Sequence, residues 1–285
     1  MNTDRPDSPI ARFWIEEGGP SWVQREQMYE TQLAPFDVAL LDALDPQPGE
    51  RVLDVGCGFG TTSAAVAACG AHVHGVDISP AMVERANERA AAAGIDARFD
   101  VIDVQTGDLG GPYDAVVSRY GVMFFDDPVE AFANMAGATA PGGRLVFVCW
   151  QPIDANPWMS MPTDVVRALL DEVPSDMPPI GPMVGPNPFA FGDRAFVERM
   201  LTEAGWDSIL IQPCTPTIRI GGDGGVAGAV EQGLNGSGVK ALLAMTDDPT
   251  VRERAAERLA EEYAPHLVDG VVSMPSAAWL VTARR

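Results

Sequence analysis

Basic side chains are scarce in this sequence. Its 285 residues include 19 Lys and Arg against 40 Asp and Glu, so 19 minus 40 gives a formal net charge of −21. Nucleic-acid binding draws most of its non-specific affinity from Lys and Arg that neutralise phosphates, and anionic lipids attract the same residues. We therefore expect neither a nucleic-acid partner nor docking on a membrane, although an acidic excess also simply favours solubility.

Long apolar runs and paired cysteines are absent as well. No stretch approaches the roughly 18 apolar residues that a membrane helix needs, and the first residues carry no apolar segment typical of a secretion signal. The four cysteines, at positions 57, 69, 149 and 214, form no CxxC pair and have no histidine nearby at a metal-ligand spacing. We expect no disulfide framework, no metal site, and a cytoplasmic protein with reduced thiols.

The composition is that of a folded protein, with 46% hydrophobic and 21% charged residues. Between residues 51 and 150, short apolar runs alternate with stretches of helical periodicity. The runs predict strands and the stretches predict helices: strands at 51–55, 72–76, 98–102, 113–118 and 144–149, helices at 61–68, 80–93 and 128–138. Ser79 is suited to cap the second helix and Pro80 to begin it. Strand, helix, strand at this spacing predicts parallel strands with right-handed crossovers, hence a doubly wound α/β sheet.

The segment before this core, residues 1–50, carries widely spaced aromatic side chains. Trp14, Trp22, Tyr29 and Phe36 recur at roughly helical intervals. We expect helices that pack across the carboxyl edge of the sheet and cover the ligand cleft there. Aromatics at such a spacing favour a role in the core over contact with a ligand.

The segments that follow the core (residues 51–150) differ from it in amino-acid composition and in the pattern of apolar residues. Residues 151–192 are rich in Pro and Met and predict a cap or lid, with a helix at 162–172 and a Pro/Gly loop at 178–188. Residues 193–285 predict completion of the core by strands at 208–212 and 277–282. We interpret these strands as a terminal antiparallel hairpin around a mostly helical insertion at 221–265.

Three glycines at alternate positions follow the first predicted strand. The strand ends in Asp54 and Val55, and Gly56, Gly58 and Gly60 come directly before the expected helix. Glycines let the backbone turn tightly and approach a ligand without interference from a Cβ atom. In an open α/β sheet, ligands bind in the crevice beyond the carboxyl ends of the strands. The spacing therefore predicts a ligand site at this turn.

A dinucleotide-binding fold is the rival interpretation of the same turn. The pattern G-x-G-x-x-G, counted from Gly56, requires glycine at position 61, where this chain has Thr61. Asp54, two residues before the first glycine, opposes a pyrophosphate but suits a ligand that carries a cationic amine and a sulfonium. Both features favour a cationic ligand over a dinucleotide.

Acidic residues also end the second and third predicted strands. Asp77 lies 21 residues after Gly56, where a carboxylate can accept hydrogen bonds from both ribose hydroxyls. The alternative is a charge that favours the start of the next helix. Ile78 would then lie against a flat base, and Asp103 would accept a hydrogen bond from an exocyclic amine. Asp100 competes with Asp103 for that role.

Together these motifs resemble those of class I S-adenosylmethionine-dependent methyltransferases. The residues that carry the resemblance, over about 36–150, are 52–60, Gly75–Ser79, Asp103 and Pro141–Leu145. Within that class they are similar to the small-molecule enzymes related to the ubiquinone/menaquinone-biosynthesis type. The resemblance implies a seven-stranded, mostly parallel, Rossmann-like sheet and S-adenosylmethionine as the cofactor.

The resemblance also implies which residues contact the cofactor. It assigns backbone contacts to Gly56 and Gly58 and the ribose to Asp77, beside the cation-facing Asp54. Adenine contacts are assigned to Ile78, Asp103 and Val104, and Met82 is a further predicted cofactor contact. After the fourth strand, Ser118, Arg119 and Tyr120 would lie beside the methionyl part and the transferred methyl group.

No general base stands out, and three residues are candidates for catalysis. Tyr120 can hydrogen-bond an acceptor, Asp126 lies in the loop expected over the methyl site, and His266 follows Pro265 in the cap. Asp126 and Asp127 can equally cap the helix at 128–138. Arg119 can bind an acidic substrate group or pair with one of these aspartates. We interpret His72 and His74, inside the second strand, as buried structural residues.

Apolar and aromatic residues around the expected methyl site predict the substrate wall. Such residues suit an adaptable apolar pocket, although packing within the cap explains them equally well. The candidates are Trp22, Tyr120, Met123, Phe124, Trp150 and Trp158. The sequence lacks the Asn/Asp-Pro-Pro-Tyr/Phe stretch of the nucleic-acid amino-methyltransferases after the fourth strand, which again disfavours DNA or RNA as the acceptor.

The sequence thus predicts methyl transfer from S-adenosylmethionine to an oxygen, nitrogen or carbon atom of a small metabolite. Two alternatives stay open. One is a protein that binds S-adenosylmethionine without catalysis, which the missing general base favours. The other is an NAD(P)-dependent oxidoreductase, which Thr61 and Asp54 disfavour. The oligomeric state is also open, a homodimer included.

Overall fold

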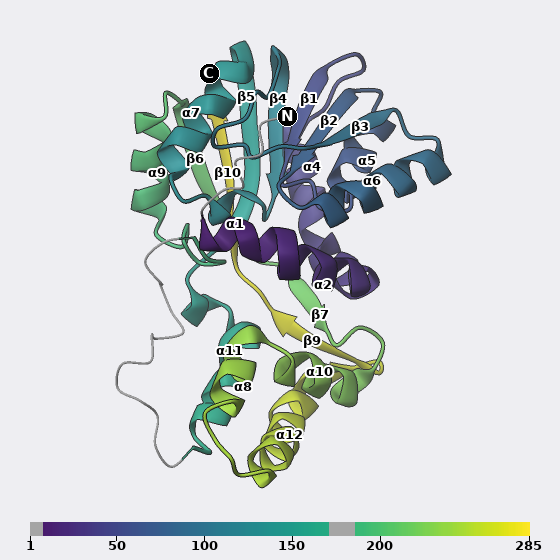
Figure 1. The fold of residues 1–285 in the computed structure, drawn as a ribbon, viewed down its shortest axis with the longest axis vertical. Helices are drawn as coiled ribbons and strands as arrows, with labels where there is room; N and C mark the ends of the chain where they lie inside the picture. The colour runs from purple at the N-terminus through teal and green to yellow at the C-terminus, as the bar shows by residue number, and fades with distance from the viewer. Residues whose placement is uncertain (1–7, 171–185) are drawn as a thin grey trace.

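A seven-stranded sheet forms the upper half of the computed structural model, which describes residues 8–170 and 186–285 (Figure 1). The strand order is β3-β2-β1-β4-β5-β10-β6. Five neighbouring strands are parallel: β1 (Arg51–Val55), β2 (His72–Asp77), β3 (Ala97–Val101), β4 (Tyr113–Arg119) and β5 (Thr139–Trp150). β10 (Ala278–Arg284) runs antiparallel between β5 and β6 (Asp207–Cys214). The seven-stranded, mostly parallel sheet is confirmed.

Helices cover both faces of this sheet. α4 (Asp37–Leu44) contacts α5 (Thr61–Ala68), and α7 (Pro128–Ala138) contacts α9 (Arg194–Glu203) on the other face. α6 (Pro80–Ala93) packs against β2 and β3. The strands are buried on both faces, as parallel strands between helices must be, and this explains their near-continuous Val and Leu content.

The start of α6 differs in one detail from the sequence prediction. Pro80 is its first residue, but the Ser79 hydroxyl makes no capping hydrogen bond. The Ser79 N–H instead donates to Asp77 Oδ1 at 2.9 Å. Asp77, which ends β2, therefore organises the connection to the helix.

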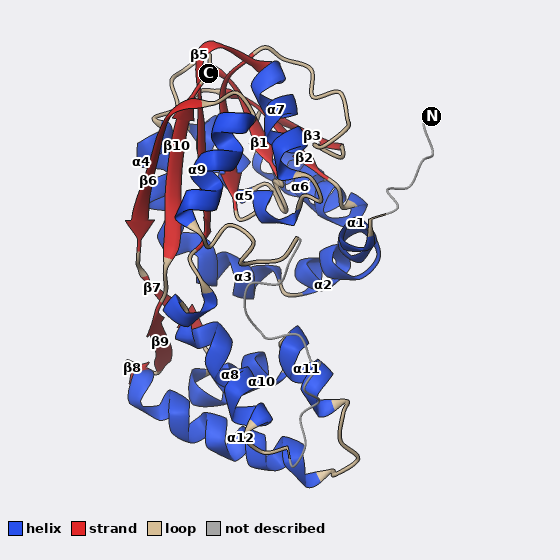
Figure 2. Cartoon of the chain, turned by 90° about the vertical axis from the view of Figure 1, so that its left-hand side faces the viewer, coloured by secondary structure: helices blue, strands red, loops and turns tan. Residues whose placement is uncertain are grey.

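The lower half of the molecule is a separate cap (Figure 2). It contains α8 (Pro157–Arg167), which follows β5, and three helices that lie between β6 and β10 in the chain: α10 (Gly225–Leu234), α11 (Ser237–Leu243) and α12 (Thr250–Tyr263). A small antiparallel sheet in the order β7-β9-β8 joins this insertion: β7 (Thr217–Ile220), β8 (Leu267–Val268) and β9 (Val271–Pro275). The sequence analysis did not predict this sheet.

The first helix of the cap begins earlier than the sequence suggested. We expected it at 162–172, with Pro162 as its first residue, but α8 begins at Pro157 and contains Pro162 in its interior. Two prolines five residues apart both suit a helix start, and the first of them takes it. The Pro/Gly loop at 178–188, predicted as a lid, lies mostly outside the described residues.

Four short N-terminal helical segments lie between the sheet and the cap (Figures 1 and 2). They are α1 (Pro9–Phe13), a π-helical turn (Trp14–Gly18), α2 (Gly19–Gln24) and α3 (Glu26–Leu33). α2 packs closely on the start of α6, since Ser79 Oγ leaves no room for a Cβ atom at Gly19. Among the described residues, no helix is long and apolar enough to cross a membrane.

Candidate functional site

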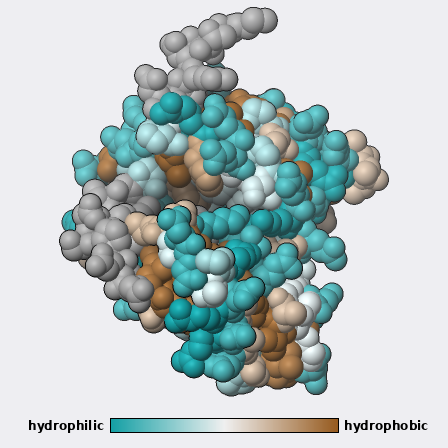
Figure 3. Space-filling view, turned by 60° about the horizontal axis from the view of Figure 1, so that its bottom comes forward, coloured by the Kyte–Doolittle hydropathy of each residue, from teal (hydrophilic) through white to brown (hydrophobic). Residues whose placement is uncertain are grey.

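A large cavity separates the sheet from the cap. It has a volume of about 1710 Å³ and is lined by the carboxyl ends of β1, β2 and β4, by the N-terminal helices and by the cap helices. Figure 3, which views the molecule from the cap side, shows a hollow between its two parts with hydrophobic residues at its wall. The cavity lies beyond the carboxyl ends of parallel strands, where open α/β sheets bind ligands.

The glycine turn forms the floor of this cavity. Gly56, Gly58 and Gly60 have φ of +63°, +53° and +78°, a conformation that residues with a side chain rarely adopt. A Cβ atom at Gly56 would lie 2.7 Å from the Cα of Gly121, so the turn packs tightly against the loop after β4. At Gly58, a Cβ atom would meet nothing within 4 Å. The Gly58 backbone is therefore open to a ligand.

Asp77 holds this turn in place. Its Oδ2 accepts a hydrogen bond from the Gly58 N–H at 3.0 Å, while Oδ1 accepts the one from Ser79. Burial raises the pKa of Asp77, and the backbone donors of Ser79 and Gly58 oppose that rise. The carboxylate lines the cavity at the end of β2.

Asp54 is the more deeply buried acid of the site, with 1% of its surface exposed. Its Oδ2 accepts a hydrogen bond from Ser63 Oγ at 2.6 Å, and its Oδ1 has no hydrogen-bond partner. Burial raises the pKa of Asp54 to about 6, although Ser63 and Arg119 act in the opposite direction. An unpartnered buried carboxylate oxygen at a cavity wall needs a donor or a cation.

The structure also brings together the residues predicted to lie near the base of the cofactor. Ile78, Met82, Asp103 and Val104 all line the cavity, and Asp103 Oδ1 accepts a hydrogen bond from the Gln105 N–H at 3.0 Å. Asp100, the competitor of Asp103, instead lies 3.0 Å from His74 Nε2 and is not part of the lining.

These features fit S-adenosylmethionine, the cofactor that the sequence resemblance implies. The open backbone at Gly58 leaves room for a nucleoside to approach the turn. The orphan oxygen of Asp54 can receive a cationic amine, and Asp77 ends the strand where ribose hydroxyls would lie.

Two residues predicted beside the methionyl part have structural partners. Ser118 is fully buried and does not line the cavity; its Oγ accepts a hydrogen bond from the Gly121 N–H at 3.2 Å. Arg119 lines the cavity but is paired with Asp37 at 2.9 Å and with Glu30 at 3.3 Å. The expectation that Arg119 pairs with Asp126 or Asp127 is wrong, because its partners are carboxylates from α3 and α4.

The ion pairs of Arg119 continue into a network that sequence analysis missed. Glu30 also lies 3.5 Å from Arg89, and Glu26 lies 3.3 Å from Arg89 and 2.6 Å from Arg85. Glu26 and Glu30 are four residues apart, as are Arg85 and Arg89, so each pair presents its charges on one helix face. This matched spacing of opposite charges was the available signal.

The three candidate catalytic residues have different surroundings. The Tyr120 ring stacks on Trp150 with centroids 4.1 Å apart, but its hydroxyl is buried and has no hydrogen-bond partner. Burial, with contributions from Cys214 and Cys149, raises the pKa of Tyr120 well above its ordinary value. Asp126 is exposed in the cavity lining, whereas Asp127 caps α7 by accepting from the Glu130 N–H at 3.0 Å.

His266 is not among the cavity-lining residues, because it lies in the turn after α12 that leads into β8. The structure therefore does not bring His266 together with the other candidate catalytic residues. His74 is buried, as expected, and contacts the Tyr113 hydroxyl at 2.6 Å. His72 is not buried: at the first residue of β2, its side chain is 66% exposed.

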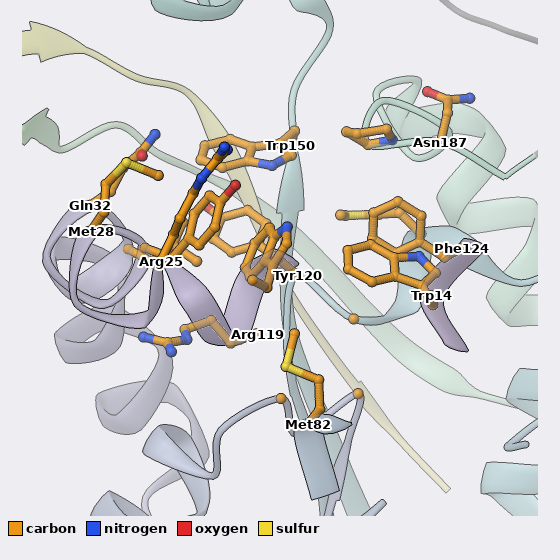
Figure 4. Close-up of a pocket in the computed structure, with 18 of the residues that line it drawn as sticks. Trp14, Arg25, Met28, Gln32, Met82, Arg119, Tyr120, Phe124, Trp150 and Asn187 are labelled. Atoms are coloured by element: carbon orange, nitrogen blue, oxygen red, sulfur yellow. The ribbon is translucent and has the colours of Figure 1, made fainter. Parts of the chain in front are cut away.

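All six candidate substrate residues line the cavity: Trp22, Tyr120, Met123, Phe124, Trp150 and Trp158. Five of them, all except Met123, belong to two aromatic groups. Trp150 contacts Tyr120 and Trp158, while Trp14 contacts Trp22 and Phe124. Figure 4 shows Trp14 and Phe124 on one side of the cavity and Tyr120 and Trp150 at its centre.

The N-terminal aromatics only partly follow the sequence interpretation. Phe36 is fully buried in the core, as expected, but Trp14, Trp22 and Tyr29 line the cavity. The sequence analysis also missed Arg25, Met28 and Gln32, which line the cavity at the start of α3 and along it. Their spacing of three and four residues was the available signal, but it does not say what the face contacts.

Comparisons with known proteins agree with this geometry. A family model described as a methyltransferase domain matches residues 52–143. The chain is 34% identical over 155 residues to aklanonic acid methyltransferase from Streptomyces sp., covering 51% of this chain and 70% of that protein. It is 32% identical over 185 residues to demethylmenaquinone methyltransferase from Beutenbergia cavernae, covering 60% and 71%. An uncharacterised protein of Mycobacterium tuberculosis is 35% identical over 124 residues, with 43% and 45% covered.

Solved structures show the same fold at lower identity. The YcgJ protein from Bacillus subtilis has a TM-score of 0.56 at 18% identity, over 87% of this chain and 97% of that one. Phosphoethanolamine N-methyltransferase 2 from Haemonchus contortus, solved with S-adenosyl-L-methionine, has a TM-score of 0.55 at 14% identity, over 97% and 60%. With two relatives above 30% identity matched over most of their length, the chain belongs to the class I S-adenosylmethionine-dependent methyltransferases.

Proposed function

We propose that this methyltransferase transfers a methyl group to an oxygen, nitrogen or carbon atom of a small, largely apolar metabolite held between the sheet and the cap. The observation that carries the proposal is that one cavity joins the glycine turn to the aromatic walls. Cofactor and acceptor would therefore share a single space, as in-line methyl transfer requires.

The size of the cavity supports two ligands. Pockets for one small molecule commonly span about 300–1,000 Å³, and this cavity has about 1710 Å³. The glycine turn, Asp54 and Asp77 supply the polar end. Trp22, Phe124 and Trp158 supply apolar walls from the N-terminal helices, the loop after β4 and the cap.

Residues of this chain would hold the cofactor at defined atoms. The Gly58 backbone would face the nucleoside, Asp77 would accept hydrogen bonds from the ribose, and Asp54 Oδ1 would receive the cationic amine. Ile78 and Val104 would lie against the adenine. When bound, S-adenosylmethionine supplies a methyl carbon already activated by positive sulfur.

The contribution of the protein is then mainly alignment and exclusion of water. Holding reactants in line can supply on the order of 7–11 kcal/mol. Asp126 is the base candidate that the geometry favours, since it is exposed in the cavity lining, whereas burial raises the pKa of Tyr120 well above its ordinary value. An acceptor that is already nucleophilic would need little help from a base.

The relatives support a small-molecule acceptor, because the names of two of them specify aklanonic acid and demethylmenaquinone. We further propose that the chain acts in the cytoplasm and has no nucleic-acid partner. The net charge of −21 and four free cysteines support both statements.

The proposal is tested by incubating the protein with methyl-labelled S-adenosylmethionine and a fractionated metabolite extract. Label should enter an apolar, low-molecular-mass fraction, and Gly58→Val should abolish this transfer. Binding of S-adenosylhomocysteine without labelling of any fraction would favour a protein that binds the cofactor without catalysis. Labelling of a protein or nucleic-acid fraction alone would overturn the proposed acceptor class.

A further inference from the structure

Two cationic side chains line the cavity among the described residues, Arg25 and Arg119. The guanidinium of Arg119 is neutralised by Asp37 and Glu30. Arg25, in contrast, has neither an ion pair nor a side-chain hydrogen bond with any described residue.

Arg25 lies at the junction of α2 and α3, and its carbonyl oxygen accepts hydrogen bonds from the N–H groups of Met28 at 3.0 Å and Tyr29 at 3.2 Å. Met28 and Gln32, three and seven residues later, also line the cavity. Figure 4 shows the Arg25 side chain extended into the cavity, with its guanidinium toward Trp150.

The carboxylates of α3 do not form ion pairs with Arg25, because they pair with other arginines. Glu26 pairs with Arg85 and Arg89 of α6, and Glu30 pairs with Arg89 and Arg119. These ion pairs hold the acids toward the sheet domain, while Arg25 faces the cavity.

An apolar acceptor would make this unpaired charge costly. While water fills the cavity, it hydrates the guanidinium, but an acceptor packed against Trp150 and Trp158 displaces that water. A desolvated charge without a partner is strongly unfavourable, whereas a carboxylate matches the planar donors of arginine with two parallel hydrogen bonds. An acceptor that carries a carboxylate would supply this counter-charge.

We propose that Arg25 binds a carboxylate of the methyl acceptor, so that the substrate class is an apolar carboxylic acid anchored beneath the cap. This inference rests on the proposed function, which places an apolar acceptor in the cavity. S-adenosylmethionine also carries a carboxylate, and the experiment separates these two sources.

The experiment uses a matched pair of planar probes, anthraquinone-2-carboxylate and the neutral anthraquinone-2-carboxamide. Their affinities are measured by quenching of tryptophan fluorescence in the presence of saturating S-adenosylhomocysteine. The wild-type protein should bind the carboxylate about 10- to 100-fold more tightly than the amide, the range for a hydrogen bond to a charged group. Arg25→Gln should abolish this preference, and Arg25→Lys should keep part of it.

Arg199→Gln is the control for loss of charge, because Arg199 is exposed on α9 and lies outside the cavity lining. It should keep the preference. The affinity of S-adenosylhomocysteine should be the same in Arg25→Gln as in the wild type.

Each other outcome overturns a specific statement. Equal binding of the two probes to the wild type, or a preference that survives in Arg25→Gln, overturns the carboxylate assignment and leaves the apolar acceptor intact. A tenfold loss of S-adenosylhomocysteine affinity in Arg25→Gln, with an unchanged melting temperature, assigns Arg25 to the cofactor and also overturns it. If neither probe binds the wild type, the proposed apolar acceptor fails as well.

Discussion

Asp77 and Gly58 are 19 residues apart in the chain, yet the Asp77 carboxylate accepts the Gly58 N–H at 3.0 Å. This bond ties the end of β2 to the turn after β1. Because Asp77 also receives the Ser79 N–H, one carboxylate fixes both the glycine turn and the start of α6. The same group faces the cavity, so shaping the turn and binding the ribose would depend on a single side chain.

Replacing Asp77 should therefore weaken cofactor binding strongly. For Asp77→Ala we expect a loss of roughly 2–4 kcal/mol in the binding free energy of S-adenosylhomocysteine, the scale for removing a hydrogen-bonded charge. Isothermal titration calorimetry measures it. Asp96→Ala removes an aspartate that is 91% exposed and should bind normally. Unchanged binding by Asp77→Ala would refute the ribose role.

Gly58 allows a test of the open floor of the cavity. At φ of +53°, any larger residue is strained, but its Cβ atom would meet no protein atom within 4 Å. Gly58→Val should therefore lower the melting temperature moderately and reduce cofactor affinity by at least tenfold, because its side chain occupies the approach to the turn.

Gly49 supplies the matched control for that substitution. Its φ is +83°, its Cβ position is equally open, and it is not part of the cavity lining. Gly49→Val should show a similar loss of melting temperature with normal binding of S-adenosylhomocysteine. Equal losses of affinity in both variants would mean that strain alone, rather than occupation of the site, causes the effect at Gly58.

The core and the cofactor end of the cavity could be predicted from sequence because their signals are local. The apolar runs of β1 and β2 are continuous, and the glycines and Asp77 hold fixed positions at the ends of those strands. Ligand-facing residues at the carboxyl ends of parallel strands converge for topological reasons, so neighbouring motifs meet in space.

The rest depended on contacts between distant segments. β7 and β9 pair across more than fifty residues, and each is a short strand whose partner no local pattern indicates. Helical periodicity placed Trp14 and Trp22 on helices but could not say whether their face meets the core or a cavity. The partners of Arg119, residues 30 and 37, lie in helices that the sequence alone cannot position over β4.

Asp54 should make cofactor affinity depend on pH. Its pKa is raised to about 6 in the free protein because burial disfavours the carboxylate. A bound cationic amine favours the ionised form and lowers that pKa. Affinity should therefore be full above pH 7 and should fall, by up to tenfold per unit, as pH drops below about 6. Calorimetric titration of S-adenosylhomocysteine between pH 5 and 8 measures this slope.

The variant Asp54→Asn isolates this group from Asp77, whose pKa is also raised. It should bind more weakly at pH 7 and show a smaller slope below pH 6. The contribution of Asp54 to the stability of the free protein should have the opposite pH dependence to its contribution to cofactor affinity. With its pKa raised by folding, Asp54 stabilises the folded state below about pH 4, and this contribution is lost as pH rises through 6. Identical slopes in both proteins would contradict the role of Asp54.

Arg119, at the end of β4, should stabilise the packing of α3 and α4 against the sheet through its ion pairs. Its side chain is 10% exposed and pairs with Asp37 and Glu30, which are 23% and 20% exposed. Arg119→Met would leave two largely buried carboxylates without a cation, and we expect a loss of about 2–3 kcal/mol in the free energy of unfolding at pH 7. Chemical denaturation measures it.

The pH dependence and a double variant distinguish lost charge pairing from lost packing. Burial already raises the pKa of Asp37 while Arg119 lowers it, so removing Arg119 should raise that pKa further. A carboxyl with a raised pKa is destabilising only above its unfolded pKa, so the deficit of Arg119→Met should shrink as pH falls below 4. Adding Asp37→Asn should restore part of the stability at pH 7, because the amide needs no cation. A deficit that is constant with pH and unchanged by Asp37→Asn would show that Arg119 acts through packing alone.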